Sequence, residues 1–218
     1  MSYEQENKQA LVAYFNEGAK GDKPLGALGV EVEHFVVTAE GEHPVSYAGG
    51  EGEFGVRDVL AHLADAYPQH THGLEGDLIG LASDEASITL EPAAQLEISI
   101  APYSSIGQIL RVYSEFRSKV VPFLAEHGCK LVTSGYHPTA RALELTLIPK
   151  QRYRFMNTYF MEIGTHGERM MRASASTQVS VDYRDEADAI RKMRIAQALA
   201  PIFASVTDNT AVFEAEPA

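Results

Sequence analysis

Hydrophobic and polar residues alternate from Ile88 to Ile100, which predicts a β-strand with two different faces. One face is apolar and consists of Ile88, Leu90, Ala94, Leu96, Ile98 and Ile100. The other face is polar and consists of Thr89, Glu91, Gln95, Glu97 and Ser99. We interpret this stretch as one half-buried antiparallel strand, around which the rest of the chain is organised.

Two further segments alternate in the same way and carry unusual polar faces. In residues 29–37, Glu31 and Glu33 lie on one face of the predicted strand, whereas His34 falls on the opposite face as a core or edge histidine. Like charges so close repel each other and gain nothing unless a cation lies between them. In residues 174–183 the polar face is small and rich in hydrogen-bonding groups, which suits a pocket lining: Ser174, Ser176, Gln178, Ser180 and Asp182.

Apolar residues at helical spacing predict five helices, at residues 3–17, 56–67, 106–126, 151–161 and 185–199. We expect the first to cover the core. The buried stripe expected for the long third helix is Ile106, Ile109, Leu110, Tyr113, Phe116, Val120 and Phe123. Residues 38–55 and the histidine-rich residues 70–72 are expected to be polar loops, and residues 130–136 a strand.

These elements predict an α+β fold with a largely antiparallel sheet, helices on one face and an open polar face on the other. The apolar fraction of 45% is sufficient for a real core. The chain has no internal repeat and no low-complexity linker, so we expect residues 1–218 to form a single domain.

The charge and the cysteine content narrow the possible partners. A formal net charge of −12 repels phosphate backbones, so nucleic acid is not expected as a partner. No run approaches the roughly 20 apolar residues of a membrane span, and the N-terminus lacks a secretory pattern, so we predict a cytoplasmic protein away from membranes. The single cysteine, Cys129, cannot form an internal disulfide and is assigned no role.

If the three alternating strands share one sheet, their polar groups meet on its open face. Oxygen-rich clusters with several carboxylates suit magnesium or manganese, whereas zinc prefers histidine and cysteine. Carboxylate-bound magnesium with arginines nearby fits phosphoryl transfer, in which the protein positions and neutralises the phosphates. A paired-carboxylate glycosidase is the weaker alternative, because the chain has no tryptophan to form a sugar platform.

Four runs of sequence resemble the plant-type glutamate–cysteine ligases and their bacterial relatives, within the glutamine synthetase-like carboxylate–amine ligases. They are Gly29-Val-Glu-Val-Glu-His-Phe35, Ile88-Thr-Leu-Glu-Pro-Ala-Ala-Gln-Leu-Glu-Ile-Ser99, Pro149-Lys-Gln-Arg-Tyr-Arg-Phe-Met156 and the run from Gly164 to Asp182. The chain thus resembles the N-terminal part of such a ligase. Two departures are Glu91-Pro-Ala-Ala-Gln95, where the family usually has Glu-Pro-Gly-Gly-Gln, and Gln178-Val-Ser180, where it usually has Gln-Val-Asn.

The resemblance implies a role for each candidate residue. Glu31, Glu33 and Glu97 are expected to be catalytic as magnesium ligands. Substrate binding is expected of Gln95, Arg152, Tyr153 and Arg172, where Arg172 begins the long strand. Nucleotide binding is expected of Gln178 and Ser180.

The implied reaction is an ATP- and magnesium-dependent ligation in glutathione-type thiol biosynthesis. The γ-carboxylate of glutamate is joined to the amine of cysteine, or of another amine, through an acyl phosphate. Family members are longer than this chain, so the alternative is a shortened, non-catalytic relative that binds nucleotide or amino acid. An exposed sheet edge is expected to pair with another chain, which predicts a homo-oligomer.

Overall fold

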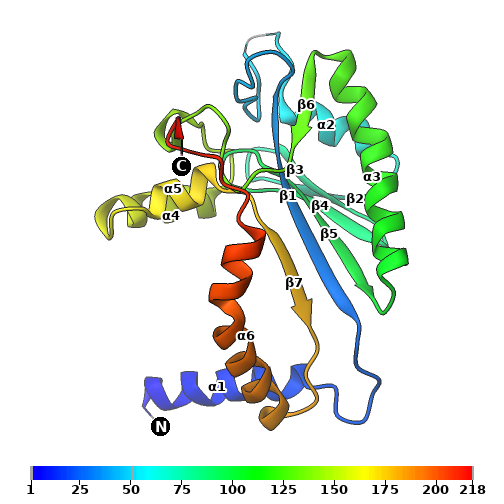
Figure 1. The fold of residues 1–218 in the computed structure, drawn as a ribbon, viewed down its shortest axis with the longest axis vertical. Helices are drawn as coiled ribbons and strands as arrows, with labels where there is room; N and C mark the ends of the chain where they lie inside the picture. Colours follow the sequence, from blue (N-terminus) through cyan, green and yellow to red (C-terminus); the bar gives the residue numbers. More distant parts are fainter. Residues whose placement is uncertain (1, 51, 218) are drawn as a thin grey trace.

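The computed structural model describes residues 2–50 and 52–217, and a mostly antiparallel β-sheet lies at its centre (Figure 1). The strands are β1 (Leu28–Thr38), β2 (Gln69–His72), β3 (Leu78–Ala82), β4 (Ala86–Leu90), β5 (Leu96–Tyr103), β6 (Cys129–Val132) and β7 (Thr177–Val181). Their order is β2-β3-β4-β5-β1-β6, with β7 also paired to β1. The predicted α+β class is confirmed, whereas the relation to glutamine synthetase and the single domain stay predictions.

The described residues form six helices: α1 (Tyr3–Gly18), α2 (Val56–Leu63), α3 (Ile106–Glu126), α4 (Gln151–Glu162), α5 (Gly167–Ala173) and α6 (Glu186–Thr207). A 3-10 turn, η1 (Ala142–Glu144), precedes α4, and β8 (Val212–Phe213) and β9 (Glu216–Pro217) form a small hairpin. No helix within residues 2–50 and 52–217 is long and apolar enough to cross a membrane.

Helices α2 and α3 cover the apolar face of the sheet and build the main core with it. Leu60 of α2, Phe116 and Val120 of α3, and Ile88 and Ile98 of the strands are completely buried there. The spacing of these residues explains the layer, because a helix and a strand each turn one apolar side to the same interior. The polar face of the sheet is left free for chemistry.

The prediction of one strand from Ile88 to Ile100 was wrong, because this stretch is a hairpin. Strands β4 and β5 pair antiparallel, with Ile88 opposite Ile98 and Leu90 opposite Leu96. Between them the amide of Ala94 donates to the carbonyl of Glu91 at 2.9 Å, and the amide of Glu91 donates to the carbonyl of Gln95 at 3.0 Å. This closes a tight turn with Pro92 in its second position, where proline is favoured. Ala94 adopts a left-handed backbone with φ of 69°.

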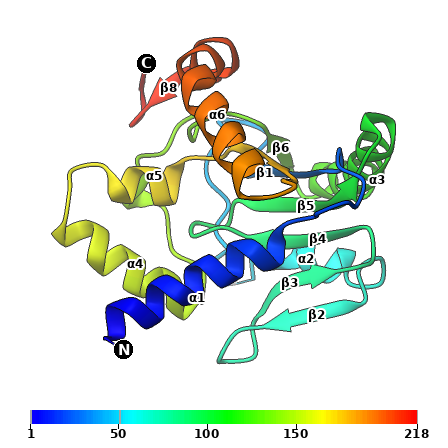
Figure 2. The same cartoon turned by 90° about the horizontal axis from the view of Figure 1, so that it is seen from below.

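Two predicted helices differ in what they cover. Helix α1 was expected to cover the core, yet all of its residues described in the structure are exposed or only half-buried, and the same holds for α6. Helix α1 lies beyond the ends of the strands, whereas α6 runs beside β7, and α3 lies on the other side of β1 from α6 (Figure 1 and Figure 2). The stripe predicted for α3 is rotated, since Ile106 and Leu110 are exposed whereas Val112 and Leu124 are buried.

Four smaller predictions also need correction. The strand expected over residues 174–183 is only five residues long, and Arg172 lies in helix α5 rather than at the start of a strand. The histidines at 70 and 72 belong to strand β2 and not to a loop. Helix α6 was expected to end at residue 199, but it continues past Pro201 to Thr207, so the proline lies inside the helix.

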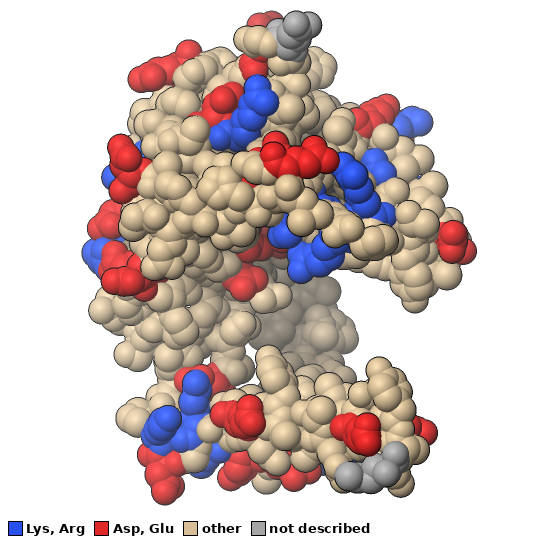
Figure 3. All heavy atoms as spheres, turned by 180° about the vertical axis from the view of Figure 1, so that it is seen from behind, with Lys and Arg blue, Asp and Glu red and all other residues tan. Residues whose placement is uncertain are grey.

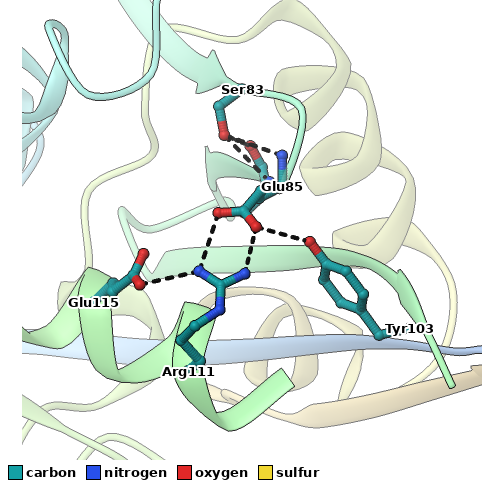
Figure 4. Close-up of polar contacts among 6 residues, drawn as sticks. Ser83, Glu85, Tyr103, Arg111 and Glu115 are labelled. Carbon is teal, nitrogen blue, oxygen red and sulfur yellow. Dashed lines mark hydrogen bonds and ion pairs between the residues drawn. The ribbon is translucent and has the colours of Figure 1, made fainter. Parts of the chain in front are cut away.

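A polar cluster at the far end of the hairpin ties the sheet to α3 (Figure 4). The carboxylate of Glu85, in the turn before β4, accepts hydrogen bonds from the Arg111 guanidinium and from the Tyr103 hydroxyl, the latter at 3.0 Å. Arg111 also pairs with Glu115 at 3.0 Å, one helical turn away. These partners hold the pKa of Glu85 below its usual range, chiefly through the Arg111 hydrogen bond. The polar groups of this cluster bond one another and link the sheet to α3, which is a structural role.

Candidate active site

Two neighbouring strands, β1 and β5, bring the predicted carboxylates together on the open face of the sheet, and β7 adds Gln178 beside them. Pairing of β1 with β5 places Glu33 directly opposite Glu97 and Glu31 opposite Ser99. Pairing of β1 with β7, on the other edge of β1, places Gln178 opposite Glu31. The three polar faces therefore share one sheet, which was the condition for their polar groups to meet. We refer to Glu31, Glu33 and Glu97 as the carboxylate cluster.

Each carboxylate of the cluster is oriented by neighbouring donors. Glu31 accepts from the Gln178 side-chain amide at 2.9 Å. Glu33 accepts from the backbone amide and the hydroxyl of Ser176, both at 2.9 Å. Glu97 accepts at one oxygen from the hydroxyls of Thr89 at 2.6 Å and Ser99 at 3.0 Å. These hydrogen bonds come from neutral groups, so they fix the position of the carboxylates without neutralising their charge.

The electrostatics of the cluster favour a cation. Burial raises the pKa of Glu31, and the charges of Glu97 and Glu33 raise it further. Burial also raises the pKa of Glu33, the Ser176 hydrogen bonds lower it, and Glu97 raises it again. Carboxylates that disfavour one another's ionisation are held together at a cost, and a divalent cation between them removes that cost.

The donor set fits magnesium bound together with phosphates. Among the described residues, no three histidine, cysteine, aspartate or glutamate side chains converge on one point to hold a metal alone. Magnesium keeps several waters and is usually held by one or two carboxylates plus substrate phosphates, so it does not require such a group. The oxygen-only chemistry of Glu31, Glu33 and Glu97 suits this mode of binding.

Residues of both charges, Glu91, Lys150 and Arg152, lie beside the carboxylate cluster. Sequence analysis assigned no site role to Glu91 or Lys150. Burial raises the pKa of Glu91, Glu97 and Glu33 raise it further, and Lys150 and Arg152 lower it. The influence of Glu97 and Glu33 shows that Glu91 extends the cluster. Its position on the polar face of the alternating stretch was the available signal, as was the place of Lys150 two residues before Arg152.

Tyr153 connects this group to the hairpin. Its ring is 1% exposed, and its hydroxyl donates to the Leu90 carbonyl at 3.2 Å while Arg152 donates to it at 3.1 Å. The charged nitrogen of Lys150 and the guanidinium of Arg152 each lie 4.9 Å from the ring centre. Burial and the nearby Glu91 raise the pKa of Tyr153 to about 12, so it stays a neutral donor. Two cations are thereby held at the edge of an acidic face.

Gln95 lies in the interior of the hairpin turn. Its side chain is 1% exposed and donates to the carbonyls of Arg172 at 3.1 Å and Ser174 at 2.9 Å. Its side-chain oxygen accepts from the amide of Ala93 at 2.9 Å. These bonds clamp the turn to the segment that leads into β7. The substrate-binding role expected of Gln95 stays a prediction.

Two other candidates lie apart from the carboxylates. The Arg172 guanidinium donates to Asn157 Oδ1 at 2.6 Å and to the Leu145 carbonyl at 2.9 Å. It lines a separate hollow of about 730 Å³, together with Arg154 and Arg57. Ser180 lies opposite Gly29 on β1, two pairs beyond Gln178. The roles expected of Arg172 and Ser180 stay predictions.

The space-filling view shows a deep notch between the body of the molecule and the arm formed by α1 (Figure 3). Acidic atoms gather at the inner end of the notch, and basic atoms lie along its upper edge. Opposite charges around one opening suit a substrate that carries both phosphate, approached through a metal, and carboxylate.

Comparison with known proteins agrees with the motifs. The model of Glutamate-cysteine ligase family 2 (GCS2) matches residues 27–217. The chain is 31% identical to glutamate–cysteine ligase A of Oryza sativa subsp. japonica over 210 residues, which are 96% of this chain and 41% of that protein. It is also 31% identical to glutamate–cysteine ligase of Arabidopsis thaliana over 211 residues, or 96% of this chain and 39% of that protein. The chain thus spans about two fifths of the length of these curated relatives.

The names of these relatives overturn one prediction. Both are described as chloroplastic, which contradicts the cytoplasmic location predicted for this chain. That prediction depended on the lack of a secretory pattern, which bears on export and not on entry into a plastid. The cytoplasmic location was therefore wrongly inferred.

Proposed function

The chain belongs to glutamate–cysteine ligase family 2, and on that basis we propose that it acts in ATP- and magnesium-dependent ligation of glutamate to cysteine, a step of glutathione-type biosynthesis. The observation that supports this proposal is the carboxylate cluster, in which Glu33 faces Glu97 across two strands with Lys150 and Arg152 nearby. Phosphoryl transfer requires this combination of metal-holding carboxylates and fixed cations.

Each group has a role in the two chemical steps. A γ-carboxylate oxygen of glutamate attacks the terminal phosphorus of ATP, the bond to ADP breaks, and an acyl phosphate results. The amine of cysteine then attacks the acyl carbon, phosphate leaves, and the amine loses a proton. No side-chain nucleophile is needed, so catalysis depends on positioning and on charge neutralisation.

The residues of this chain supply those two requirements. Glu31, Glu33 and Glu97 would hold the magnesium ions, which neutralise the phosphates. Arg152 and Lys150 would hold a carboxylate of the amino-acid substrate, since both cations are fixed on Tyr153. Glu91, half-buried beside them, would accept a hydrogen bond from the substrate ammonium.

The test is calorimetric binding of the non-hydrolysable ATP analogue AMP-PNP with and without magnesium. Glu97→Gln keeps the size of the side chain and an oxygen that accepts from Thr89 and Ser99, so the fold should persist. We expect magnesium-dependent binding to weaken at least tenfold, because a metal ligand has lost its charge. Glu126→Gln, on the exposed outer side of α3, is the matched control.

Wild-type affinity in Glu97→Gln would remove this residue from the site. Turnover is tested separately, as release of ADP with magnesium and single amino acids. We expect glutamate to stimulate release. Nucleotide binding without any such release would instead match the non-catalytic alternative.

A further inference from the structure

The side chain of His34 lies behind the carboxylate cluster, on the apolar face of the sheet. It is completely buried, and it follows Glu33 directly on β1. The register pairs Glu33 with Glu97 and His34 with Leu96, which is the last pair between β1 and β5. From Phe35 onward β1 pairs with β6 instead. The Glu33–Glu97 pair therefore lies next to the place where two strands part, and the ends of paired elements open most easily.

Two hydrogen bonds hold the imidazole of His34 between β5 and α3. The Leu96 carbonyl can only accept, so His34 Nδ1 donates to it at 3.0 Å. Burial lowers the pKa of His34 to about 4, so the neutral ring accepts at Nε2 from the Tyr113 hydroxyl at 2.8 Å. His34 thus bonds, through one nitrogen, the strand that carries Glu97 and, through the other, the helix.

Aromatic packing fixes the orientation of the imidazole. The His34 and Tyr113 rings are stacked with their centroids 5.7 Å apart, and the Phe116 ring of the same helix lies 5.8 Å from His34. The Arg117 guanidinium lies over the Tyr113 ring, 5.8 Å from its centre. Packing that locks a rotamer also fixes the direction of its hydrogen bonds. Helix α3 thereby determines where His34 holds the Leu96 carbonyl.

We propose that His34 and Tyr113 are positioning residues for the metal site, which fix the separation of Glu33 and Glu97 from behind the sheet. This inference depends on the proposed function, in which these carboxylates hold magnesium. Leu96 precedes Glu97 in the chain, so a shift of the Leu96 carbonyl also moves the Glu97 backbone and its carboxylate. Magnesium requires a near-ideal octahedral arrangement of oxygens at about 2.0–2.1 Å, so even a small displacement weakens its binding.

The test is calorimetric binding of AMP-PNP at a series of magnesium concentrations, which separates the magnesium affinity from the fraction of competent protein. His34→Leu removes both hydrogen bonds. We expect the magnesium dissociation constant to rise roughly tenfold, as when an outer partner of a metal ligand is lost. Tyr113→Phe removes only the second bond and keeps the ring, so a rise of about threefold is expected. His34→Asn keeps a donor in place of Nδ1 and should restore the affinity to within about threefold of wild type.

Tyr47→Phe is the matched control, because it also removes one hydroxyl from a tyrosine that packs in the core. The Tyr47 hydroxyl donates to the Leu78 carbonyl at 2.9 Å, in β3, two strands away from β5. This variant should bind magnesium and AMP-PNP as wild type does. A purely structural role for His34 predicts a different result: less competent protein and a lower free energy of unfolding, with the magnesium dissociation constant unchanged.

Wild-type magnesium affinity in His34→Leu and Tyr113→Phe would overturn this inference, as would an equal loss of affinity in Tyr47→Phe. If His34→Leu does not fold, Tyr113→Phe decides alone. The proposed function survives such a result when Glu97→Gln still weakens magnesium-dependent binding. Both proposals fall if Glu97→Gln binds magnesium and AMP-PNP as tightly as wild type.

Discussion

Replacing Ala94 by glycine tests whether the hairpin turn stores backbone strain. Ala94 has φ of 69°, a region that L-residues other than glycine occupy at a cost of roughly 1–2 kcal/mol. The residue is only 2% exposed, so glycine also removes a buried methyl group worth about 0.8 kcal/mol. Glycine further gains freedom in the unfolded chain, which costs the fold about 0.4–1 kcal/mol.

These contributions nearly cancel, so Ala94→Gly should change the free energy of unfolding by less than about 0.8 kcal/mol. Ala86→Gly is the matched control, because Ala86 is 4% exposed in the same core and lies in strand β4 without a positive φ. It loses the methyl group and gains the freedom but relieves no strain. We expect it to destabilise the protein by about 1.5 kcal/mol.

The assay is equilibrium unfolding in urea, which compares midpoints at unchanged slope. The difference between the two variants measures the strain at Ala94 alone. Equal destabilisation by Ala94→Gly and Ala86→Gly would refute the reasoning, because it would mean that the turn accommodates alanine without cost.

Three further outcomes are expected. Gln95→Leu should lower the free energy of unfolding by about 2–3 kcal/mol, because it leaves the Ala93 amide and two carbonyls unpaired. Urea unfolding measures this loss, with the exposed Gln108→Leu as the control. A loss below about 1 kcal/mol would contradict the prediction. Burial lowers the pKa of His137 from 6.5 to about 4, so its stabilising contribution is complete above pH 6.5 and is lost as the pH falls to 4, a change of about 3 kcal/mol. Unfolding titrations across that window should show a shallower fall for His137→Asn, whose side-chain oxygen still accepts from Ala140, and an identical slope would count against it. Sedimentation equilibrium should show self-association that strengthens as the salt concentration rises. Salt screens the repulsion from the net charge of −12, while the exposed apolar residues of α6 become buried between two chains. A protein that stays monomeric at high salt would refute this prediction.

The alternation of residues predicted the polar face but could not distinguish a strand from a hairpin. Leu90 and Leu96 are six residues apart, an even number, so both point to the core whether the chain runs straight or turns back. Pro92 was the local signal for a turn, because proline is rarely found inside a central strand. The prediction therefore placed the carboxylates on the correct face of the sheet, although it took the β4–β5 hairpin for a single strand.

What the sequence lacked was information on which surfaces meet. The helical spacing of Leu11 and Phe15 predicted α1, but spacing does not say what a helix covers, and both residues are exposed. Arg172 and Arg152 belong to neighbouring runs, yet the folded chain turns Arg172 toward Asn157 and leaves Arg152 at Tyr153. Such differences depend on contacts between distant segments, which no local pattern records.

Pairing of β7 with β1 has a consequence for the order in which the protein is made. Glu31 and Gln178 are 147 residues apart, so at a synthesis rate of about 5–20 residues per second β1 leaves the ribosome roughly 7–30 s before its partner. Strand β5 is available much earlier and pairs with the other edge of β1. During the interval one edge of β1 is open, and the charges of Glu31 and Glu33 disfavour its pairing with a neighbouring nascent chain. The carboxylates that suit metal binding in the finished protein thus also protect the unfinished one from aggregation.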